Sequence, residues 1–215
     1  MGQDSALQIL WLDQIDSTQR YLKDALKSGK LQSPVCVATN KQFDGKGSRA
    51  NQWIGMDGNL FFSFSVTSDM LPQDLKHESA SIYFMYLLKE ILMMQSSKVW
   101  LKWPNDFYVD NKKIAGCITN IQGKSLICGI GLNAVKAPEG FGILDIACDY
   151  HDLLVAFMRA IEKKQPWKHV FRNYKLEFEQ NKTRILLAGT CNMSDAVMMD
   201  DGSLMCHGQR IYSQR

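Results

Sequence analysis

The sequence lacks the features that mark several specialised protein classes. It has no run of about 18 apolar residues, and no basic leader precedes an apolar segment near Asp4 and Asp13 at its start. We therefore expect neither a membrane span nor a secretion signal, and a cytoplasmic location. The six cysteines form no C-x-x-C pair and have no paired histidines beside them. This pattern argues against a zinc site or a disulfide scaffold, and we interpret the cysteines as small apolar fillers.

The chain also lacks a strong charge of either sign. The net charge is only +3 at pH 7, too slight to indicate nucleic acid as the main partner. Internal repeats and low-complexity tracts are absent. The 215 residues are 46% hydrophobic and 22% charged, as in ordinary folded proteins. This length and composition predict one domain with a full core and a small appendage.

A stretch in the middle of the chain combines strand character with polar residues. Residues 98–103 alternate polar and apolar side chains and stop at Pro104, which cannot donate a hydrogen bond to a neighbouring strand. Asn105 and Asp106 follow directly. The pattern therefore places an amide and a carboxylate where a strand ends and a pocket can begin.

The residues after Asp106 predict a β-hairpin. Residues 107–109 resume strand character, and 110–111 are turn formers before the next strand. That strand carries Lys113 near its start and Gly116 three residues later, where a ligand can approach the backbone closely. An amine is thus expected beside the amide and carboxylate at a single opening.

Two earlier segments can also bind ligands. Residues 16–19, Asp-Ser-Thr-Gln, predict a helix start with a capping box, and Gly29 closes the helix. Free N–H groups at such a start can bind polar ligands. The loop 40–53 contains Gly45 and Gly47 among basic and polar residues, which suits an anion. It is not a Walker A loop because the spacing differs.

Later segments have ordinary structural patterns. Residues 74–95 predict a helix with one apolar face and one wet face that includes Lys89, and two more helices are expected near 149–164 and 168–181. The strand 125–133 contains Gly129-x-Gly131, a weak dinucleotide fingerprint because the third glycine and the following helix are missing. From residue 184 the pattern indicates short strands with turns.

The pentapeptide Lys102-Trp103-Pro104-Asn105-Asp106, followed by Lys113-x-x-Gly116, resembles the signature of biotin protein ligases. These enzymes adenylate biotin with ATP and transfer it to a lysine of a carrier domain. The resemblance implies an α+β fold: a mixed, largely antiparallel sheet flanked by helices, in a class II synthetase-like catalytic domain (1–182) with a short SH3-like β appendage (183–215). About fifteen residues precede Asp16, too few for the family's DNA-binding module. We therefore expect the monofunctional type, which binds neither DNA nor membrane.

The resemblance also implies residue roles. Lys113 would offset the repulsion between the biotin carboxylate and the α-phosphate, Trp53 would stack on adenine, and Asn133 would hydrogen-bond the adenine edge. The implied residues are, for catalysis, Lys113, Asp106 and Arg49; for biotin, Ser17, Thr18, Gln19, Gln42, Gly45, Lys46, Gly47, Ser48, Lys113 and Gly116; for ATP, Arg49, Trp53, Lys102, Asn105 and Asn133.

The implied ligands and partners are biotin, Mg²⁺-ATP and the biotin carboxyl carrier domain of acetyl-CoA carboxylase. No metal ligand is assigned to a protein side chain, although Asn105 and Asp106 could help to position Mg²⁺-ATP. Asp106 could also help to deprotonate the incoming lysine. The chain is expected to be a monomer or a weak homodimer.

The loop departs from the family pattern Gly-Arg-Gly-Arg-x-Gly-Arg-x-Trp. Lys46, Ser48, Ala50 and Asn51 replace three arginines and a glycine. Lysine keeps charge but loses the planar fork that binds phosphate in bidentate fashion. We therefore expect weaker retention of the adenylate or greater reliance on Arg49. A Ser48→Arg variant that releases biotinyl-adenylate at the unchanged rate would contradict this hypothesis.

Two alternatives stay open. Lipoate or octanoate ligases share the fold, but their Arg-Arg-x-(Ser)-Gly-Gly-Gly loop and their lack of the pentapeptide do not match this chain. The second alternative is a catalytically dead module that binds biotin or a carrier domain. It is suggested by the loop, in which three arginines and a glycine of the family pattern are replaced. Retention of Lys113, Asn105, Asp106 and Asn133 argues against it.

Overall fold

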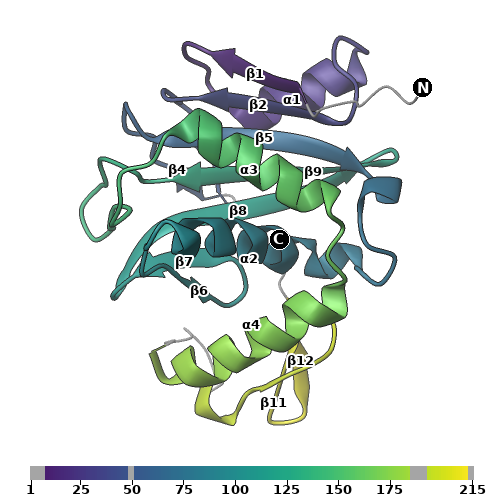
Figure 1. Ribbon diagram of the computed structural model, residues 1–215, viewed down its shortest axis with the longest axis vertical. Helices are drawn as coiled ribbons and strands as arrows, with labels where there is room; N and C mark the ends of the chain where they lie inside the picture. The colour runs from purple at the N-terminus through teal and green to yellow at the C-terminus, as the bar shows by residue number, and fades with distance from the viewer. Residues whose placement is uncertain (1–7, 48–50, 185–192, 213–215) are drawn as a thin grey trace.

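The computed structural model describes residues 8–47, 51–184 and 193–212, and its centre is a seven-stranded sheet (Figure 1). In spatial order the strands are β1 (Gln8–Leu12), β2 (Val35–Thr39), β5 (Leu60–Thr67), β9 (Ser125–Leu132), β8 (Lys112–Gln122), β7 (Asp106–Val109) and β6 (Trp100–Lys102). Strands β1 and β2 are parallel, and the other neighbours are antiparallel. The predicted α+β fold with a mixed, largely antiparallel sheet is confirmed.

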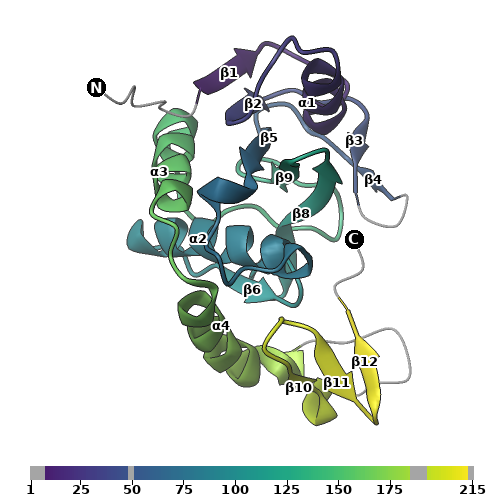
Figure 2. The same cartoon turned by 90° about the vertical axis from the view of Figure 1, so that its right-hand side faces the viewer.

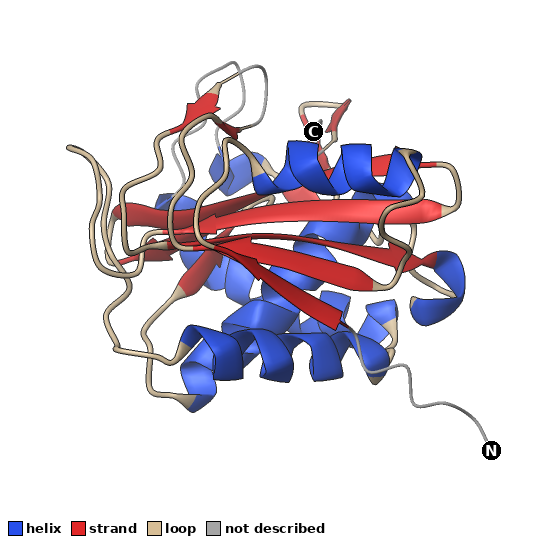
Figure 3. Cartoon of the chain, turned by 90° about the horizontal axis from the view of Figure 1, so that it is seen from above, coloured by secondary structure: helices blue, strands red, loops and turns tan. Residues whose placement is uncertain are grey.

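Helices cover both faces of this sheet. The described helices are α1 (Thr18–Lys27), α2 (Ala80–Met94), α3 (Tyr150–Glu162) and α4 (Trp167–Asn181), with 3₁₀ turns η2 (Ser68–Met70), η3 (His77–Ser79), η4 (Lys182–Arg184) and η5 (Met193–Asp195). Figure 2 shows α2 and α3 on one side of the sheet and α1 on the other, next to the small hairpin of β3 (Gly45–Lys46) and β4 (Gln52–Trp53). The view from above shows the strands between the two helical layers (Figure 3).

The alternation along β5 explains why the two faces differ. Phe62 and Phe64 point to the α2–α3 side, where the Phe64 ring lies edge-on to Phe84 at 4.9 Å and to Phe157 at 5.4 Å. Ser63 points to the opposite face, toward α1. One face of the sheet is therefore a dry core, and the other is partly polar and available for a site.

The start of α1 differs by one residue from the prediction. Ser17, not Asp16, is the N-cap, and its hydroxyl accepts a hydrogen bond from the backbone N–H of Arg20 at 3.4 Å. Asp16 instead pairs with the guanidinium of Arg20 at 3.1 Å. The C-terminus is as predicted, since Gly29 has φ of +74° just beyond the last turn.

Helix α2 is shorter and more buried than predicted. It begins at Ala80 rather than near residue 74, because Asp74 accepts the backbone N–H groups of Trp167 and Lys168 at 2.9 and 3.0 Å and so caps α4. The prediction that Lys89 lies on a solvent-exposed face of this helix is wrong. This side chain is only 7% exposed and forms an ion pair with Glu177 of α4, which covers that face.

The C-terminal strands are β10 (Val197–Met198), β11 (Leu204–Cys206) and β12 (Gln209–Ile211), which form a small antiparallel sheet of the kind expected for the appendage. Burial alone raises the pKa of Asp201, but hydrogen bonds from Ser203 and Arg210 hold that pKa at about 2. The indole N–H of Trp103 donates to the carbonyl of Gly202 at 2.8 Å. The appendage thus contacts the central pentapeptide directly, and the domain division at residue 182 stays a prediction.

The cysteines follow the expectation with one exception. Cys36, Cys117 and Cys128 are free and buried, and burial raises the pKa of the Cys36 thiol well above its usual range. Cys206 is disulfide-bonded, so its interpretation as a simple filler is wrong. Cys191 lies outside the described residues.

Among the described helices, none has the length and apolar character that a membrane crossing requires.

Candidate active site

Glycines on β8 and β9 form a flat floor on the partly polar face of the sheet. Gly116 pairs with Gly131 across the two strands, and Gly129 lies two residues before Gly131. A Cβ on Gly131 would lie 2.6 Å from the indole of Trp53, closer than real contacts allow. Glycine at this position is therefore what lets the Trp53 ring lie against the strand.

A register shift brings Lys113 onto this floor. In a regular strand, residues three apart point to opposite faces, so Lys113 and Gly116 would be separated. The pairing of β7 with β8 shifts between Phe107 and Tyr108, as at a β-bulge. The ammonium of Lys113 consequently lies 3.3 Å from where a Cβ of Gly116 would be, and 2.9 Å from Oδ1 of Asp106.

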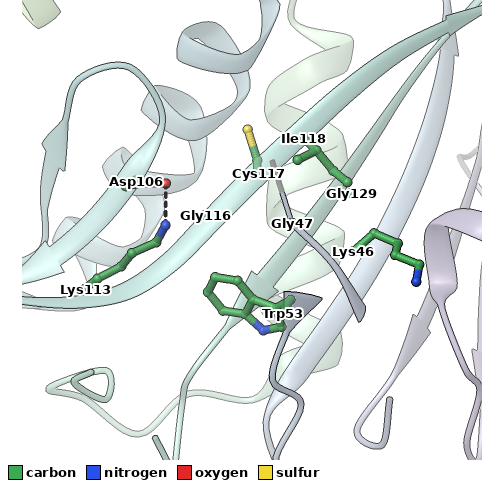
Figure 4. Close-up of a pocket in the computed structure, with 9 residues that line it drawn as sticks. All are labelled: Lys46, Gly47, Trp53, Asp106, Lys113, Gly116, Cys117, Ile118 and Gly129. Atoms are coloured by element: carbon green, nitrogen blue, oxygen red, sulfur yellow. Dashed lines mark ion pairs between the residues drawn. The ribbon is translucent and has the colours of Figure 1, made fainter. Parts of the chain in front are cut away.

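These residues line a cavity of about 290 Å³, open solvent included. The lining residues are Lys46, Gly47, Trp53, Asp106, Lys113, Gly116, Cys117, Ile118 and Gly129. Figure 4 shows the Lys113 ammonium and the Asp106 carboxylate pointing toward each other, with the Trp53 ring below them. The Lys46 side chain points away from that pair. One end of the cavity thus holds a cation and a carboxylate that are both largely shielded from solvent.

A polar but neutral cluster, the neutral end, adjoins the cavity at Gly129. The Thr18 hydroxyl lies 2.9 Å from the Ser63 hydroxyl and 3.2 Å from Oε1 of Gln42, and the Thr18 backbone N–H donates to the same oxygen at 2.9 Å. All three side chains are buried. The Ser63 hydroxyl is also 3.1 Å from a Cβ position on Gly129, which joins this cluster to the cavity.

Other predicted biotin-binding residues surround this neutral end. Ser17 is buried, and its hydroxyl caps α1. The Gln19 amide donates to Oδ1 of Asn120 at 3.1 Å. A Cβ on Gly45 would lie 2.6 Å from the Gln42 amide nitrogen and from the Trp53 carbonyl oxygen, so the chain packs closely there.

A second cavity, of about 280 Å³ with open solvent included, is also lined by Trp53. Its lining residues are Gln52, Trp53, Ile54, Asn133, Pro138 and Phe141. The Phe141 ring stands edge-on to Trp53 at 6.5 Å. Within the described part of the chain, Nδ2 of Asn133 and Nε1 of Trp53 are buried N–H groups without a hydrogen-bond partner. This apolar slot with one free amide suits a planar heteroaromatic base.

Two predicted ATP-binding residues lie outside both cavities. The Lys102 ammonium contacts the Tyr108 hydroxyl at 3.2 Å and lies over its ring. Asn105 is fully buried, and its amide donates to the backbone carbonyl of Cys117 at 2.8 Å. Its Oδ1 has no partner among the described residues. Asn105 therefore supports the strand beneath Gly116 in this structure.

The glycine-rich loop is tied to α1 by exposed ion pairs. Asp44 binds the Lys46 ammonium at 2.8 Å and also the guanidinium of Arg20. Hydrogen bonds from Lys46 first, and then from Arg20, lower the pKa of the Asp44 carboxyl. Lys46 is thus held at the side of the cavity. The predicted residues Ser48 and Arg49 lie outside the described residues.

Sequence reasoning missed Ser63, Asn120 and Asp44. Ser63 was detectable in principle, because it alternates with phenylalanines in β5 and so marks a polar face. Asn120 and Asp44 acquire their roles from contacts with α1, far away in the sequence, which no local pattern reveals.

Comparisons with known proteins point in one direction. Residues 11–133 match the biotin/lipoate A/B protein ligase family model. A structure named biotin acetyl coenzyme A carboxylase synthetase from Helicobacter pylori, with bound biotinylated ATP, superposes with a TM-score of 0.90 at 31% identity, covering 96% of this chain and 99% of that one.

Curated relatives match over part of their length. The bifunctional ligase/repressor BirA of Escherichia coli (strain K12) is 31% identical over 141 residues, 62% of this chain. The biotin–[acetyl-CoA-carboxylase] ligase of Paracoccus denitrificans is 28% identical over 139 residues, 60% of this chain. The matches cover 42% of the first relative and 55% of the second.

Proposed function

We propose, from the premise that this chain belongs to the biotin/lipoate A/B protein ligase family, that it joins biotin and ATP into biotinyl-5′-AMP and transfers biotin to a lysine of a carrier protein. The observation that carries this proposal is the position of Lys113. Its ammonium lies on the glycine floor beside Asp106 and 5.7 Å from the centre of the Trp53 ring, which lines both cavities. A cation is needed at that point, where a carboxylate and a phosphate must meet.

In the first step a biotin carboxylate oxygen attacks the α-phosphorus of ATP. The bond from phosphorus to the β-phosphate oxygen breaks, and pyrophosphate leaves. Two unit charges about 4 Å apart interact by roughly 4 kcal/mol at an effective dielectric of 20. Lys113 offsets this repulsion, and its contact with Asp106 at 2.9 Å fixes the direction of the ammonium.

In the second step the amine of the acceptor lysine attacks the acyl carbon. The bond from that carbon to the AMP oxygen breaks, and AMP leaves with the electron pair. The Lys113 ammonium stabilises the negative charge on the carbonyl oxygen, and the Asp106 carboxylate beside it helps to remove the proton from the attacking amine. The absence of side chains at Gly116 and Gly131 lets the Lys113 ammonium and the Trp53 ring lie against the strands, where both can contact the substrates.

The neutral end supports biotin over lipoate as the acid. The ureido ring of biotin has N–H donors and a carbonyl acceptor, which Thr18, Ser63 and Gln42 can satisfy. The dithiolane of lipoate has only sulfur and carbon there. Lipoate would therefore gain no hydrogen bond from these buried groups, whereas biotin would.

Mg²⁺ would enter this site with ATP, and when bound it would neutralise phosphate charge. Asp106 lines the cavity and carries a carboxylate, the hard donor that Mg²⁺ prefers. Asn105 is fully buried outside the cavity and would act by supporting the strand beneath Gly116. Because Asp106 is also paired with Lys113, the phosphates would supply most of the metal ligands.

The remaining parts of the proposal concern partners and location. The acceptor is the biotin carboxyl carrier domain of acetyl-CoA carboxylase, as the name of the Paracoccus relative suggests. The protein acts in the cytoplasm as a monomer or weak homodimer. The appendage after residue 182 supports the site through its contact with Trp103.

The first experiment is ATP–pyrophosphate exchange, run separately with biotin, lipoate and octanoate. Exchange with biotin alone is expected. Exchange with lipoate or octanoate would indicate a lipoate or octanoate ligase instead. No exchange with any acid, while biotin still binds, would indicate a binding module without catalysis. Transfer to a purified carrier domain then tests the second step.

We expect Thr18→Ala to raise the KM for biotin about tenfold and to change kcat little. The substitution removes a hydroxyl that bonds Ser63 and Gln42, and one neutral hydrogen bond contributes roughly 0.5–1.5 kcal/mol. Exchange rates at varied biotin concentration give both constants. Ser65→Ala is the control, because Ser65 lies on the same strand but bonds Ser33. An equal rise in KM for both variants would count against the assignment.

A further inference from the structure

Asn59, immediately before β5, organises the chain that follows β9. Its side chain is fully buried. Oδ1 accepts the backbone N–H groups of Ala134, Val135 and Lys136 at 3.0, 3.0 and 3.1 Å. Nδ2 donates to the carbonyl of Lys136 at 2.8 Å. A single amide thus satisfies four backbone groups of the turn that leads from Asn133 into the wall of the second cavity.

The same amide also faces the side chain of Asn133. Nδ2 of Asn59 lies 3.5 Å from Oδ1 of Asn133. The backbone of Asn133 is fixed on both sides, since its N–H donates to Ile114 and its carbonyl accepts from Leu144, each at 2.8 Å. With the backbone fixed, a donor beside one end of the Asn133 amide decides which end is the oxygen.

The other end of the Asn133 amide is consequently the donor. Its Nδ2 is buried in the wall of the second cavity and has no hydrogen-bond partner within the described residues. A buried N–H₂ group without a partner is costly unless a ligand satisfies it. Adenine offers ring nitrogens that accept hydrogen bonds, and the Trp53 ring, with Phe141 edge-on to it at 76°, offers a flat apolar face for the base.

We propose that Asn59 is a positioning residue for nucleotide recognition: it orients the Asn133 amide so that Nδ2 donates to a ring nitrogen of adenine. The inference rests on the proposed use of ATP. It adds the residue that determines whether Asn133 donates a hydrogen bond to the base or accepts one from it. Asn59 does not line the cavity and acts only through Asn133 and the turn 134–136.

The test variant is Asn59→Asp. The carboxylate has nearly the same shape and still accepts the three backbone N–H groups, which hold the turn, although the bond from Nδ2 to the Lys136 carbonyl is lost. Its second oxygen replaces the donor beside Asn133 Oδ1, and the Asn133 amide turns over so that its nitrogen faces the carboxylate. The cavity is then offered an oxygen instead of a donor.

The readout is the dissociation constant for ATP, 1-deaza-ATP, 3-deaza-ATP and 7-deaza-ATP by calorimetry without any acid, so that no reaction occurs. In the wild type, at least one analogue should bind about tenfold more weakly than ATP, as one lost hydrogen bond implies. In Asn59→Asp, the affinity for ATP should fall by a similar factor. The difference in affinity between ATP and that analogue, the analogue penalty, should disappear. Asn133→Ala should also abolish the penalty.

The control is Asp57→Asn, a swap of the same shape two residues away at an exposed ion pair with Lys41. It should leave all four dissociation constants unchanged. An analogue penalty that persists in Asn59→Asp, or ATP binding unchanged from wild type, would overturn the inference even if the melting temperature falls. Absence of ATP binding by the wild type, or of any analogue penalty in it, would also overturn it. Because the assay needs no catalysis, a failure of biotin-dependent exchange would be recognised separately.

Discussion

Replacing Lys113 with alanine is expected to lower kcat for biotin-dependent ATP–pyrophosphate exchange by about 10²–10³-fold, the loss typical when one fixed group that stabilises transition-state charge is removed. The ammonium is held on the glycine floor by Asp106, where the carboxylate and the α-phosphate meet. The charge it stabilises is greatest in the transition state, so kcat should fall more than substrate affinity does. Exchange rates and equilibrium binding of biotin, measured on the same preparation, separate the two effects.

Lys112→Ala is the matched control for this experiment. Lys112 is the neighbouring residue with the same side chain, but it is exposed and pairs with Val109 at the turn end of the hairpin. Its removal should change the exchange rate less than twofold or so, as for surface substitutions generally. Lys113→Arg should recover only part of the activity, because the larger planar group cannot take the same place beside Gly116. Exchange within tenfold of wild type for Lys113→Ala would contradict the assigned role.

The same region shows how much of the site the sequence reveals. The strand, proline, turn and glycine of the pentapeptide hairpin follow from local rules. The structure has all four, although the strand predicted over residues 98–103 is shorter, Trp100–Lys102, and the next begins one residue early, at Asp106. The spacing of Lys113 and Gly116 is different. Period-two alternation alone would have put them on opposite faces, and only the register shift beside Phe107 brings them together. Two residues three apart in a strand can therefore face the same site only where a bulge lies between them.

Contacts between distant segments were not predictable from the sequence. Thr18 contacts Ser63, and Asn59 contacts Asn133, although the two residues of each pair are far apart in the sequence. These contacts depend on β5 pairing with β9 and on α1 crossing the same face, which no local pattern specifies. The capping signal was predicted to start at Asp16 and was correct to within one residue, because caps depend on neighbouring residues alone.

Lys89 shows a failure of the same kind with a larger energetic consequence. A lysine within an apolar helix pattern normally marks the wet face, and helix α2 was predicted accordingly. The structure instead places Lys89 under α4, with its side chain 7% exposed and its partner Glu177 13% exposed. The ammonium also lies 4.7 Å from the centre of the Tyr86 ring. The second oxygen of Glu177 accepts the backbone N–H of Leu101 at 2.9 Å, at the edge strand before the pentapeptide.

Glu177→Gln should therefore lower the free energy of unfolding by about 3–5 kcal/mol, the range for breaking one side of a buried ion pair. Glutamine can still accept from Leu101, so the loss reports mainly the uncompensated charge of Lys89. Denaturant-induced unfolding gives the value. Glu179→Gln is the control, since Glu179 is on the same helix and pairs with Lys182 while 43% exposed. That variant should lose less than about 1 kcal/mol.

A Lys89→Met, Glu177→Gln double variant completes this test. Removing both charges eliminates the unpaired ammonium, so the double variant should recover most of the stability that Glu177→Gln loses. Recovery would show that the cost arises from the buried charge and not from altered packing of α4. If Glu177→Gln is no less stable than Glu179→Gln, the pair is solvated in solution and α4 does not seal this face of α2.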